Sequence, residues 1–272
     1  MMLVIGVLIA GVTESSVLIR KFKLSNAKAL TQSSPVIGIM DLSLWLETTS
    51  EKSFPEEEPD NGSLVTRWND LNNQRIINNT VSQYTDANKP VYTERSMNAL
   101  PALKFSGGQT LVANIRGENL FQADQFTIFI VQYVTSNGVA TASTILWDDD
   151  DHVNVSATQT GSIIFDAGNV ATNRIVYPVN SDFYSTSKIL SFILKSTNYG
   201  EIRINGSTPV ATNTTMTSKI AMGNTKDLII GTDFTGYIGE IIIYSRALKD
   251  AERAAVEEYL LQKWIVIGST RG

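Results

Sequence analysis

The stretch that decides the fold is Gly231–Trp264, GTDFTGYIGEIIIYSRALKDAERAAVEEYLLQKW. Its first part predicts a turn and then a strand, because Ile238, Ile241 and Ile243 are β-branched and glycines surround the start of the strand. After Asp250 the apolar residues follow a helical period, which predicts one amphipathic helix. Its buried face is expected to carry Val256, Tyr259, Leu260 and Trp264, and its solvent face Glu252, Glu257, Glu258 and Lys263.

This stretch resembles the closing strand and helix of LamG-like, concanavalin A-like jelly-roll domains. The matching pattern is GxIxEIIIYxRAL followed by DAERxAVExYLxxKW. Lys249 stands where the family commonly has Ser or Thr, so Asp250 is expected to cap the helix or to complement its dipole. The resemblance extends to DLSLWLE at Asp41–Glu47 and LPALKF at Leu100–Phe105. It implies a mainly β, antiparallel jelly-roll sandwich with a carboxy-terminal helix.

The rest of the chain reads as short strands separated by turn residues. Phe126–Val134 is apolar on both faces, which predicts a central strand. Further strands are expected at Val65–Leu71, Thr144–Trp147, Val153–Ser156, Ser162–Phe165 and Leu228–Ile230, with a hairpin of Ile189–Leu194 and Glu201–Ile204 turning at Tyr199-Gly200. About ten short strands without alternating helices again favour an all-β sandwich.

Composition excludes several classes of site. The 272 residues are 43% hydrophobic and 18% charged, which is ordinary for a folded chain. The net charge of −5 gives no support for binding a nucleic-acid backbone. Residues 1–30 nevertheless carry four basic residues against one acidic, a net of +3, and the remainder carries −8. The absence of cysteine rules out disulfides, thiolate catalysis and cysteine zinc sites.

The amino-terminal segment is a second distinct element. Met1–Val12 is uncharged and almost wholly apolar, but as a helix it is only about 18 Å long, less than the roughly 30 Å of a bilayer core. It also lacks the basic region of a secretory signal. The helical pattern continues to about Leu30, and Thr31–Pro35 supplies the stop.

This helix resembles the amino-terminal helix of type IV pilins and pseudopilins, in the stretch LVIGVLIAGV at Leu3–Val12. The family's leader, cleavage-site glycine and following glutamate do not precede it, so we expect the chain to begin at an internal methionine or to be trimmed. The resemblance implies an assembly helix whose apolar contacts are Leu3, Val4, Ile5, Val7, Leu8, Ile9, Val12, Ile19 and Phe22. The alternative is a helix packed on its own domain.

These observations divide the chain into a pilin-like helix at 1–34, a linker at 35–40 and a LamG-like sandwich with its carboxy-terminal helix at 41–267. The first functional hypothesis is a non-enzymatic subunit of a bacterial surface filament. Its helix would sit in the inner membrane of a Gram-negative-type bacterium and then pack against like subunits or other pilin-type subunits in an extracellular filament. The sandwich would bind glycans or surface proteins. The alternatives are a secreted carbohydrate-binding or adhesion module and a degenerate glycoside hydrolase.

Candidate site residues gather at one acidic turn. Asp148, Asp149, Asp150 and Asp151 could offer oxygen ligands to calcium, but consecutive carboxylates rarely converge on one ion, so a solvated hairpin is favoured. His152 is the only histidine, and Trp147 is the tryptophan expected to be exposed. We therefore expect Trp147 and His152 as ligand contacts, and no cofactor apart from the calcium alternative.

The sequence offers no catalytic arrangement. Glycosidases on concanavalin A-like scaffolds use paired carboxylates spaced E-x-D-x-x-E, which does not occur here. Glu240 belongs to the EIIIY pattern and is expected to be structural, as are Trp45, Trp68 and Trp264 in the core. We expect no enzymatic activity, and no nucleic-acid partner because no such motif is present.

Overall fold

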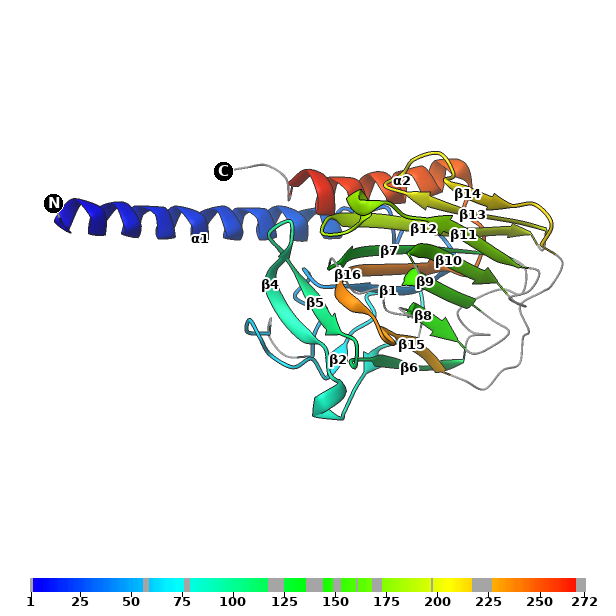
Figure 1. Ribbon diagram of the computed structural model, residues 1–272, viewed down its shortest axis with the longest axis horizontal. Helices are drawn as coiled ribbons and strands as arrows, with labels where there is room; N and C mark the ends of the chain where they lie inside the picture. Colours follow the sequence, from blue (N-terminus) through cyan, green and yellow to red (C-terminus); the bar gives the residue numbers. More distant parts are fainter. Residues whose placement is uncertain are drawn as a thin grey trace.

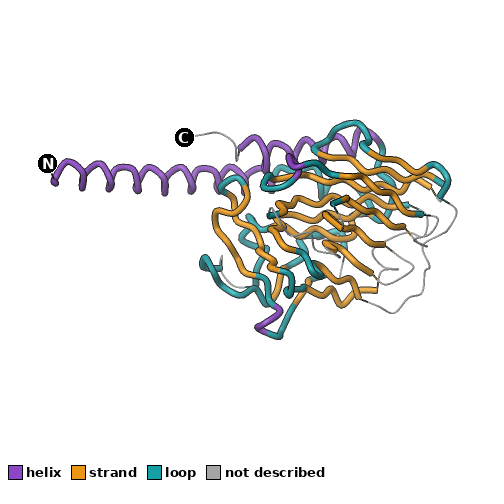
Figure 2. Tube along the Cα trace, in the orientation of Figure 1, coloured by secondary structure: helices purple, strands orange, loops and turns teal. Residues whose placement is uncertain are grey.

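The computed structural model contains two antiparallel sheets covered on one side by helices (Figure 1). It describes residues 2–55, 59–75, 79–116, 125–135, 144–148, 153–159, 161–167, 173–196, 198–216 and 227–267. Within these residues the mainly β, antiparallel sandwich with a helix near each end confirms the expected fold class. Figure 2 shows the strands as two layers, with both helices beside one of them.

The first sheet has eight strands. Its order is β14 (Ala211–Asn213), β13 (Tyr199–Ile204), β12 (Ser187–Ser196), β7 (Phe126–Val134), β16 (Thr235–Tyr244), β5 (Leu100–Ser106) and β4 (Val91–Met97). The eighth strand, β1 (Leu42–Glu47), also pairs with β16. β5 pairs with residues 235–238 of β16 and β1 with residues 240–244, so the two strands lie one after the other along the same edge.

The second sheet also has eight strands among the described residues. Its order is β11 (Arg174–Pro178), β10 (Ser162–Ala167), β9 (Val153–Gln159), β8 (Thr144–Asp148), β15 (Asp227–Ile230), β6 (Leu111–Arg116), β3 (Val81–Ser82) and β2 (Arg67–Trp68). Two 3₁₀ turns, η1 (Asp86–Asn88) and η3 (Ser181–Phe183), lie in the connections.

Two of the expected elements differ from the observed ones, and β3, β4, β6, β11 and β14 form in segments where no strand was expected. The segment Val65–Leu71 forms only the two-residue strand β2, because Asp70 and its neighbours fold into a loop beside β1. Tyr199-Gly200 was expected to form a turn, but both residues belong to β13 and pair across to β12. A turn at Asn205-Gly206 follows β13, and both residues have the positive φ angles of a tight turn.

Two apolar cores stabilise the molecule, one on each face of the first sheet. Between the sheets lie alternate residues of the central strands, including Ile128, Ile130, Ile241 and Ile243. Under the helices lie the residues that point the other way, including Phe129 and Ile242. β7 contributes to both cores and is flanked by β12 and β16, which confirms the prediction of a central strand with two apolar faces.

A bulge at Gly239 gives β16 its special geometry. Ile238 faces the core between the sheets, whereas Glu240, two residues later, faces the helices, because the register against β7 shifts between them. The indole ring of Trp264 lies over Gly239, and an added Cβ there would come within 2.5 Å of a ring carbon. Glycine is therefore required at this position, and the bulge directs the carboxylate of Glu240 towards the helices.

Two helices cover the outer face of the first sheet. α1 (Met2–Gln32) runs along the sandwich with its carboxy-terminal part and extends beyond it at the other end (Figure 1). α2 (Asp250–Leu261) continues into one π-helical turn, η4 (Gln262–Val266). The Glu252 carboxylate accepts a hydrogen bond from the Lys249 main-chain N–H at 2.9 Å, so Glu252 supplies the capping contact at the start of α2. Two guanidinium bonds from Arg246 lower the pKa of Glu252 to about 2.

The buried face of the carboxy-terminal helix differs from expectation, whereas no buried face was specified for α1. In α1 the buried residues are Lys23, Ala27 and Thr31, and Ile19 and Phe22 are 38% and 66% exposed. In the carboxy-terminal helix Glu257 and Lys263 were expected in solvent, but both are buried. Trp45, Trp68 and Trp264 are buried, as predicted. Helical periodicity places residues on faces correctly, but it misses charged residues that have buried partners.

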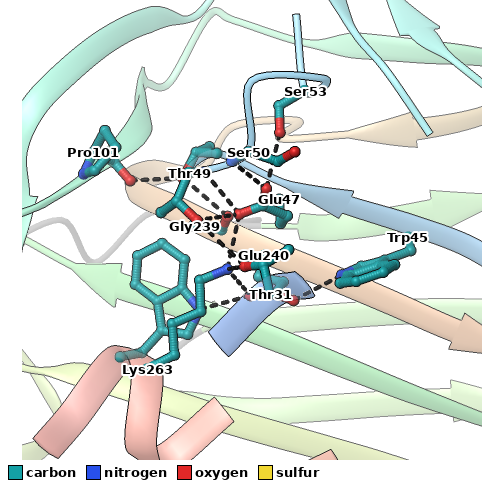
Figure 3. Close-up of polar contacts among 12 residues, drawn as sticks. Thr31, Trp45, Glu47, Thr49, Ser50, Ser53, Pro101, Gly239, Glu240 and Lys263 are labelled. Carbon is teal, nitrogen blue, oxygen red and sulfur yellow. Dashed lines mark hydrogen bonds and ion pairs between the residues drawn. The ribbon is translucent and has the colours of Figure 1, made fainter. Parts of the chain in front are cut away.

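Lys263 is the centre of a buried polar network that joins both helices to the sheet (Figure 3). Its Nζ donates to Glu47 Oε2 at 2.8 Å, to Glu240 Oε2 at 2.9 Å and to Thr31 Oγ1 at 2.8 Å. The ammonium group, Glu47 and Glu240 are fully buried. The network therefore connects α1, β1, β16 and η4 at one point.

Each carboxylate in this network has further donors. Glu240 accepts from the indole N–H groups of Trp45 and Trp264, both at 2.7 Å, and from the Tyr259 hydroxyl at 2.9 Å. Glu47 accepts from the Thr49 hydroxyl at 2.7 Å and the Ser53 hydroxyl at 3.0 Å. These donors compensate for the loss of hydration that buried charges suffer.

The surroundings keep the central pair charged. Burial alone would lower the pKa of Lys263, but the carboxylates of Glu240 and Glu47 outweigh it and raise the pKa above its ordinary value. Burial likewise acts to raise the pKa of Glu47, and the Lys263 ammonium overcomes it and lowers that pKa. The two groups are therefore a true ion pair at neutral pH.

Replacing Lys263→Met should lower the free energy of unfolding by about 3–5 kcal/mol, because two buried carboxylates lose their cation. Chemical denaturation followed by tryptophan fluorescence measures the change, since Trp45 and Trp264 adjoin the network. The control is Lys104→Met on an exposed position of β5, which should change stability by less than about 0.5 kcal/mol. Equal stability of the two variants would show that the ion pair does not hold the helices.

Candidate functional site

A cleft of about 930 Å³ lies beside this network, between the end of α1 and the segments that follow β1 and β2. Lys28, Thr31 and Gln32 of α1 form one side. The other sides are formed by the turn after β1, by β2 and by the loop after β2. The turn contributes Ser50, Glu51 and Lys52, and β2 contributes Arg67. The loop contributes Asn69, Asp70, Leu71, Asn72, Asn73, Arg75 and Thr80. Ile37 and the ring of Trp45 complete the lining.

The buried carboxylate of Asp70 organises the loop after β2. Its Oδ1 accepts from the main-chain N–H groups of Trp45 at 2.9 Å and Asn72 at 3.0 Å, and its Oδ2 accepts from that of Asn79 at 3.0 Å. Burial acts to raise the pKa of Asp70, and the three N–H donors act against that rise. One side chain thus fixes the positions of three main-chain segments.

The same loop covers the free edge of β1. The Leu71 N–H donates to the Trp45 carbonyl at 2.8 Å. The side-chain amides of Asn72 and Asn79 donate to the carbonyls of Leu42 at 2.8 Å and Ser43 at 2.9 Å. The exposed main-chain groups of an edge strand are in this way satisfied without another strand. The loop is consequently a fixed wall of the cleft.

The opposite wall depends on the buried network. Glu47 ends β1, and its carboxylate accepts from the main-chain N–H groups of Thr49 at 2.7 Å and of Ser50. The residues that follow, Ser50 to Lys52, line the cleft. Thr31, which also lines the cleft, receives a hydrogen bond from Lys263. Both the turn and the helix side of the cleft are therefore positioned by the ion pair beneath them.

The cleft combines an apolar floor with a polar rim. Trp45 is buried and Ile37 and Leu71 are partly exposed, whereas Lys52, Arg67 and Asn73 are exposed at the rim. This combination is typical of sites that bind small molecules and sugars, in which apolar surface provides contact and a few polar groups fix orientation. The Asn69 amide already donates to the Lys52 carbonyl at 3.0 Å, which ties the two loop walls together.

The structure does not test the residues expected from the sequence to form a site. Trp147 and Asp148 belong to β8, which pairs with β9 and β15, but their side chains lie outside the part that is described. Asp149, Asp150, Asp151 and His152 lie outside the described residues altogether. The acidic turn therefore stays a prediction. Within the described residues, no group of three or more acidic or histidine side chains is arranged to hold a metal ion.

Of the expected assembly residues, only Ile19 and Phe22 have described side chains, and both are exposed. The side chains of Leu3, Val4, Ile5, Val7, Leu8, Ile9 and Val12 lie outside the described part, although their backbone is helical. Among the residues that the structure describes, no helix has the combination of length and apolarity that a membrane span requires.

Sequence reasoning did not identify the cleft. The segment VTRWNDL contains Arg67, Asn69 and Asp70 but was interpreted as a strand, and the asparagine-rich residues after it as a surface excursion. Asx side chains in loops often bond to main-chain groups, so the repeated Asn and Asp residues were the available signal. That signal predicts an ordered loop, but it does not predict that α1 forms the opposite side of the cleft.

Comparison with known proteins identifies the fold alone. No family model and no curated protein matches the chain. Among solved structures, the chain is similar to the binding domain of Paraclostridial Mosquitocidal Protein 1, with 13% identity, a TM-score of 0.57, and coverage of 80% of this chain and 52% of that one. It thus matches about half the length of that toxin domain. The fold is concanavalin A-like.

Two further solved structures that are similar to the chain were determined in complex with a carbohydrate. Domain 4 of an extracellular arabinanase from Geobacillus stearothermophilus, in complex with arabinotriose, has 15% identity and a TM-score of 0.52, with 80% of this chain and 98% of that domain covered. Trypanosoma rangeli sialidase in complex with sialic acid has 15% identity and a TM-score of 0.53, with 86% and 34% covered. At these identities the likeness does not transfer a binding site.

Replacing Asp70→Asn should loosen the wall of the cleft. The amide offers one acceptor oxygen and one NH₂ group, and the NH₂ group must face a main-chain donor. We expect a loss of about 1–3 kcal/mol in the free energy of unfolding and faster hydrogen exchange at the N–H groups of Asn72 and Asn79, measured by NMR.

The matched control is Asp86→Asn, since the Asp86 side chain is 77% exposed. It should leave exchange at Asn72 and Asn79 unchanged. Exchange rates that Asp70→Asn does not alter would show that other contacts hold the loop.

Proposed function

We propose that this chain is a non-catalytic module that binds glycans in the cleft between α1 and the loop after β2. The observation that carries the proposal is the cleft itself: about 930 Å³, with an apolar floor, a polar rim and walls fixed by buried hydrogen bonds. Its size lies within the roughly 300–1,000 Å³ that is usual for ligand sites. The shared fold with a domain in complex with arabinotriose supports the choice of a sugar, by analogy only.

The carboxylates that line the cleft support a binding role rather than hydrolysis. A glycosidase needs two carboxyl groups facing one glycosidic bond, one of them as acid and the other as nucleophile or base. Asp70 uses both oxygens for main-chain N–H groups, and Glu51 receives the Lys28 ammonium at 3.2 Å. Neither is left in the arrangement that bond cleavage requires.

Filling the cleft tests this function. Asn73 is exposed and lines the cleft, so Asn73→Trp should block it and weaken the binding of oligosaccharides by at least about tenfold, or 1.4 kcal/mol. The probes are arabinotriose and an array of plant and bacterial oligosaccharides, followed by isothermal titration with those that bind. A reducing-sugar assay on the same probes should show no turnover.

The control is Asn88→Trp, at an exposed position of η1 that does not line the cleft. It should bind as the unaltered chain does. If the two tryptophan variants bind equally well, or if the unaltered chain binds no oligosaccharide on the array, the proposal is wrong.

A second function is favoured by a specific observation on α1. Leu18 and Phe22 lie one helical turn apart and are 72% and 66% exposed, on the helix that extends beyond the sandwich (Figure 1). Apolar side chains exposed together in this way are typical of surfaces that contact another protein or a membrane. We therefore also propose the pilin-like role, in which α1 packs against like helices and presents the sandwich at the surface of a bacterial cell. The two functions are compatible.

The double variant Leu18→Ser and Phe22→Ser should reduce self-association, because both changes remove apolar surface from the helix. Sedimentation velocity at several protein concentrations measures the association, and thermal unfolding should be unchanged since both side chains are exposed. Val176→Ser, at a 47% exposed position of β11, is the control. Unaltered association of the double variant would contradict the role of this surface.

A further inference from the structure

The rim of the cleft has a different charge balance from the rest of the molecule. Four basic residues line it, namely Lys28, Lys52, Arg67 and Arg75, against two acidic ones, Glu51 and Asp70. The chain as a whole has a net charge of −5. The cleft is therefore a positive region on an acidic protein, and the cations come from α1, the turn after β1, β2 and the loop after β2.

The two acidic residues leave much of this positive charge uncompensated. Asp70 is buried beneath the loop and accepts three main-chain hydrogen bonds. Glu51 interacts with Lys28 on the far side of the cleft. Lys52 and Arg67 are exposed, and neither forms an ion pair with a residue in the described part of the chain.

These cations are suited to an anionic group on a sugar. A guanidinium group presents a planar pair of N–H donors that matches the two oxygens of a carboxylate or sulfate, and a lysine ammonium adds a compact charge. The Arg75 guanidinium donates to the Ser43 hydroxyl at 3.3 Å, which holds it at the wall of the cleft. Below the cations, Ile37 and Leu71 provide an apolar surface on which a sugar ring can rest.

We propose that the cleft selects acidic glycans, oligosaccharides whose sugars carry carboxylate or sulfate groups, through Arg67, Lys52 and Arg75. The inference rests on the glycan-binding function proposed above and adds the class of ligand. Nucleic acid is disfavoured because the chain as a whole is acidic, with a net charge of −5.

Two matched pairs of probes test the role of charge. The first is an oligogalacturonate and its fully methyl-esterified form, which differ in the carboxylate charge. The second is a heparin-derived oligosaccharide and its desulfated form, which differ in sulfate groups. In at least one pair, the charged member should bind the full chain about fivefold or more tighter in isothermal titration, as exposed ion pairs of up to about 1 kcal/mol each would give. The preference should shrink as salt is raised from 50 to 500 mM.

The double variant Lys52→Gln and Arg67→Gln should abolish most of that preference without changing thermal unfolding, because both side chains are exposed. The control is the double variant Arg95→Gln and Lys104→Gln, which makes the same change of charge at exposed positions outside the cleft. It should keep the preference. The pair that shows the preference identifies the anionic group as carboxylate or sulfate.

Several outcomes would overturn the inference. One is equal binding of charged and neutral members in both pairs, and another is equal loss in the two double variants. A single-stranded oligonucleotide of the same charge that binds as tightly and is equally sensitive to Lys52→Gln and Arg67→Gln would also overturn it. If neutral and charged members bind equally and Asn73→Trp prevents the binding of both, the proposed glycan-binding function stands while the acidic specificity fails.

Discussion

The Lys263 ammonium, held between the carboxylates of Glu47 and Glu240, is the interaction on which the arrangement of this molecule depends. Charges without solvent are costly, and they persist only where partners fill their hydrogen-bonding capacity. Here two indole N–H groups, the hydroxyls of Tyr259, Thr31, Thr49 and Ser53, and main-chain donors complete the set. A polar site of this kind tolerates few alternative arrangements, so it fixes how the helices lie on the sheet.

The network also explains why the cleft has defined walls. Glu47 holds the turn after β1 through hydrogen bonds, and Lys263 holds the end of α1 in the same way. Asp70 holds the loop after β2 against the edge of β1. The cations at the rim are thus carried by segments whose main chains are fixed, although the side chains themselves are exposed. Fixed supports reduce the conformational entropy that the protein would otherwise lose on binding a ligand.

Much of the fold was predictable from the sequence. Apolar periodicity located the central strand, because β7 packs against apolar layers on both faces, and it located the carboxy-terminal helix through Val256, Leu260 and Trp264. The bulge at Gly239 was not predictable, since it depends on the position of the Trp264 ring. Lys263 and Glu257 were assigned to solvent because their partners, Glu47 and Ser191, are distant in sequence. The cleft was missed for the same reason: its walls come from segments that only the tertiary fold brings together.

The hydrogen bond between Lys263 and Thr31 connects α1 mechanically to the sandwich. A load applied along this helix would reach the sandwich through several contacts, among them Arg20 with Glu94, Lys28 with Glu51 and Thr31 with Lys263. The last of these leads into β1 and β16, which are paired by a ladder of main-chain hydrogen bonds. Lys28, Thr31 and Gln32 line the cleft as well, so tension on the helix would act directly on one wall of the cleft.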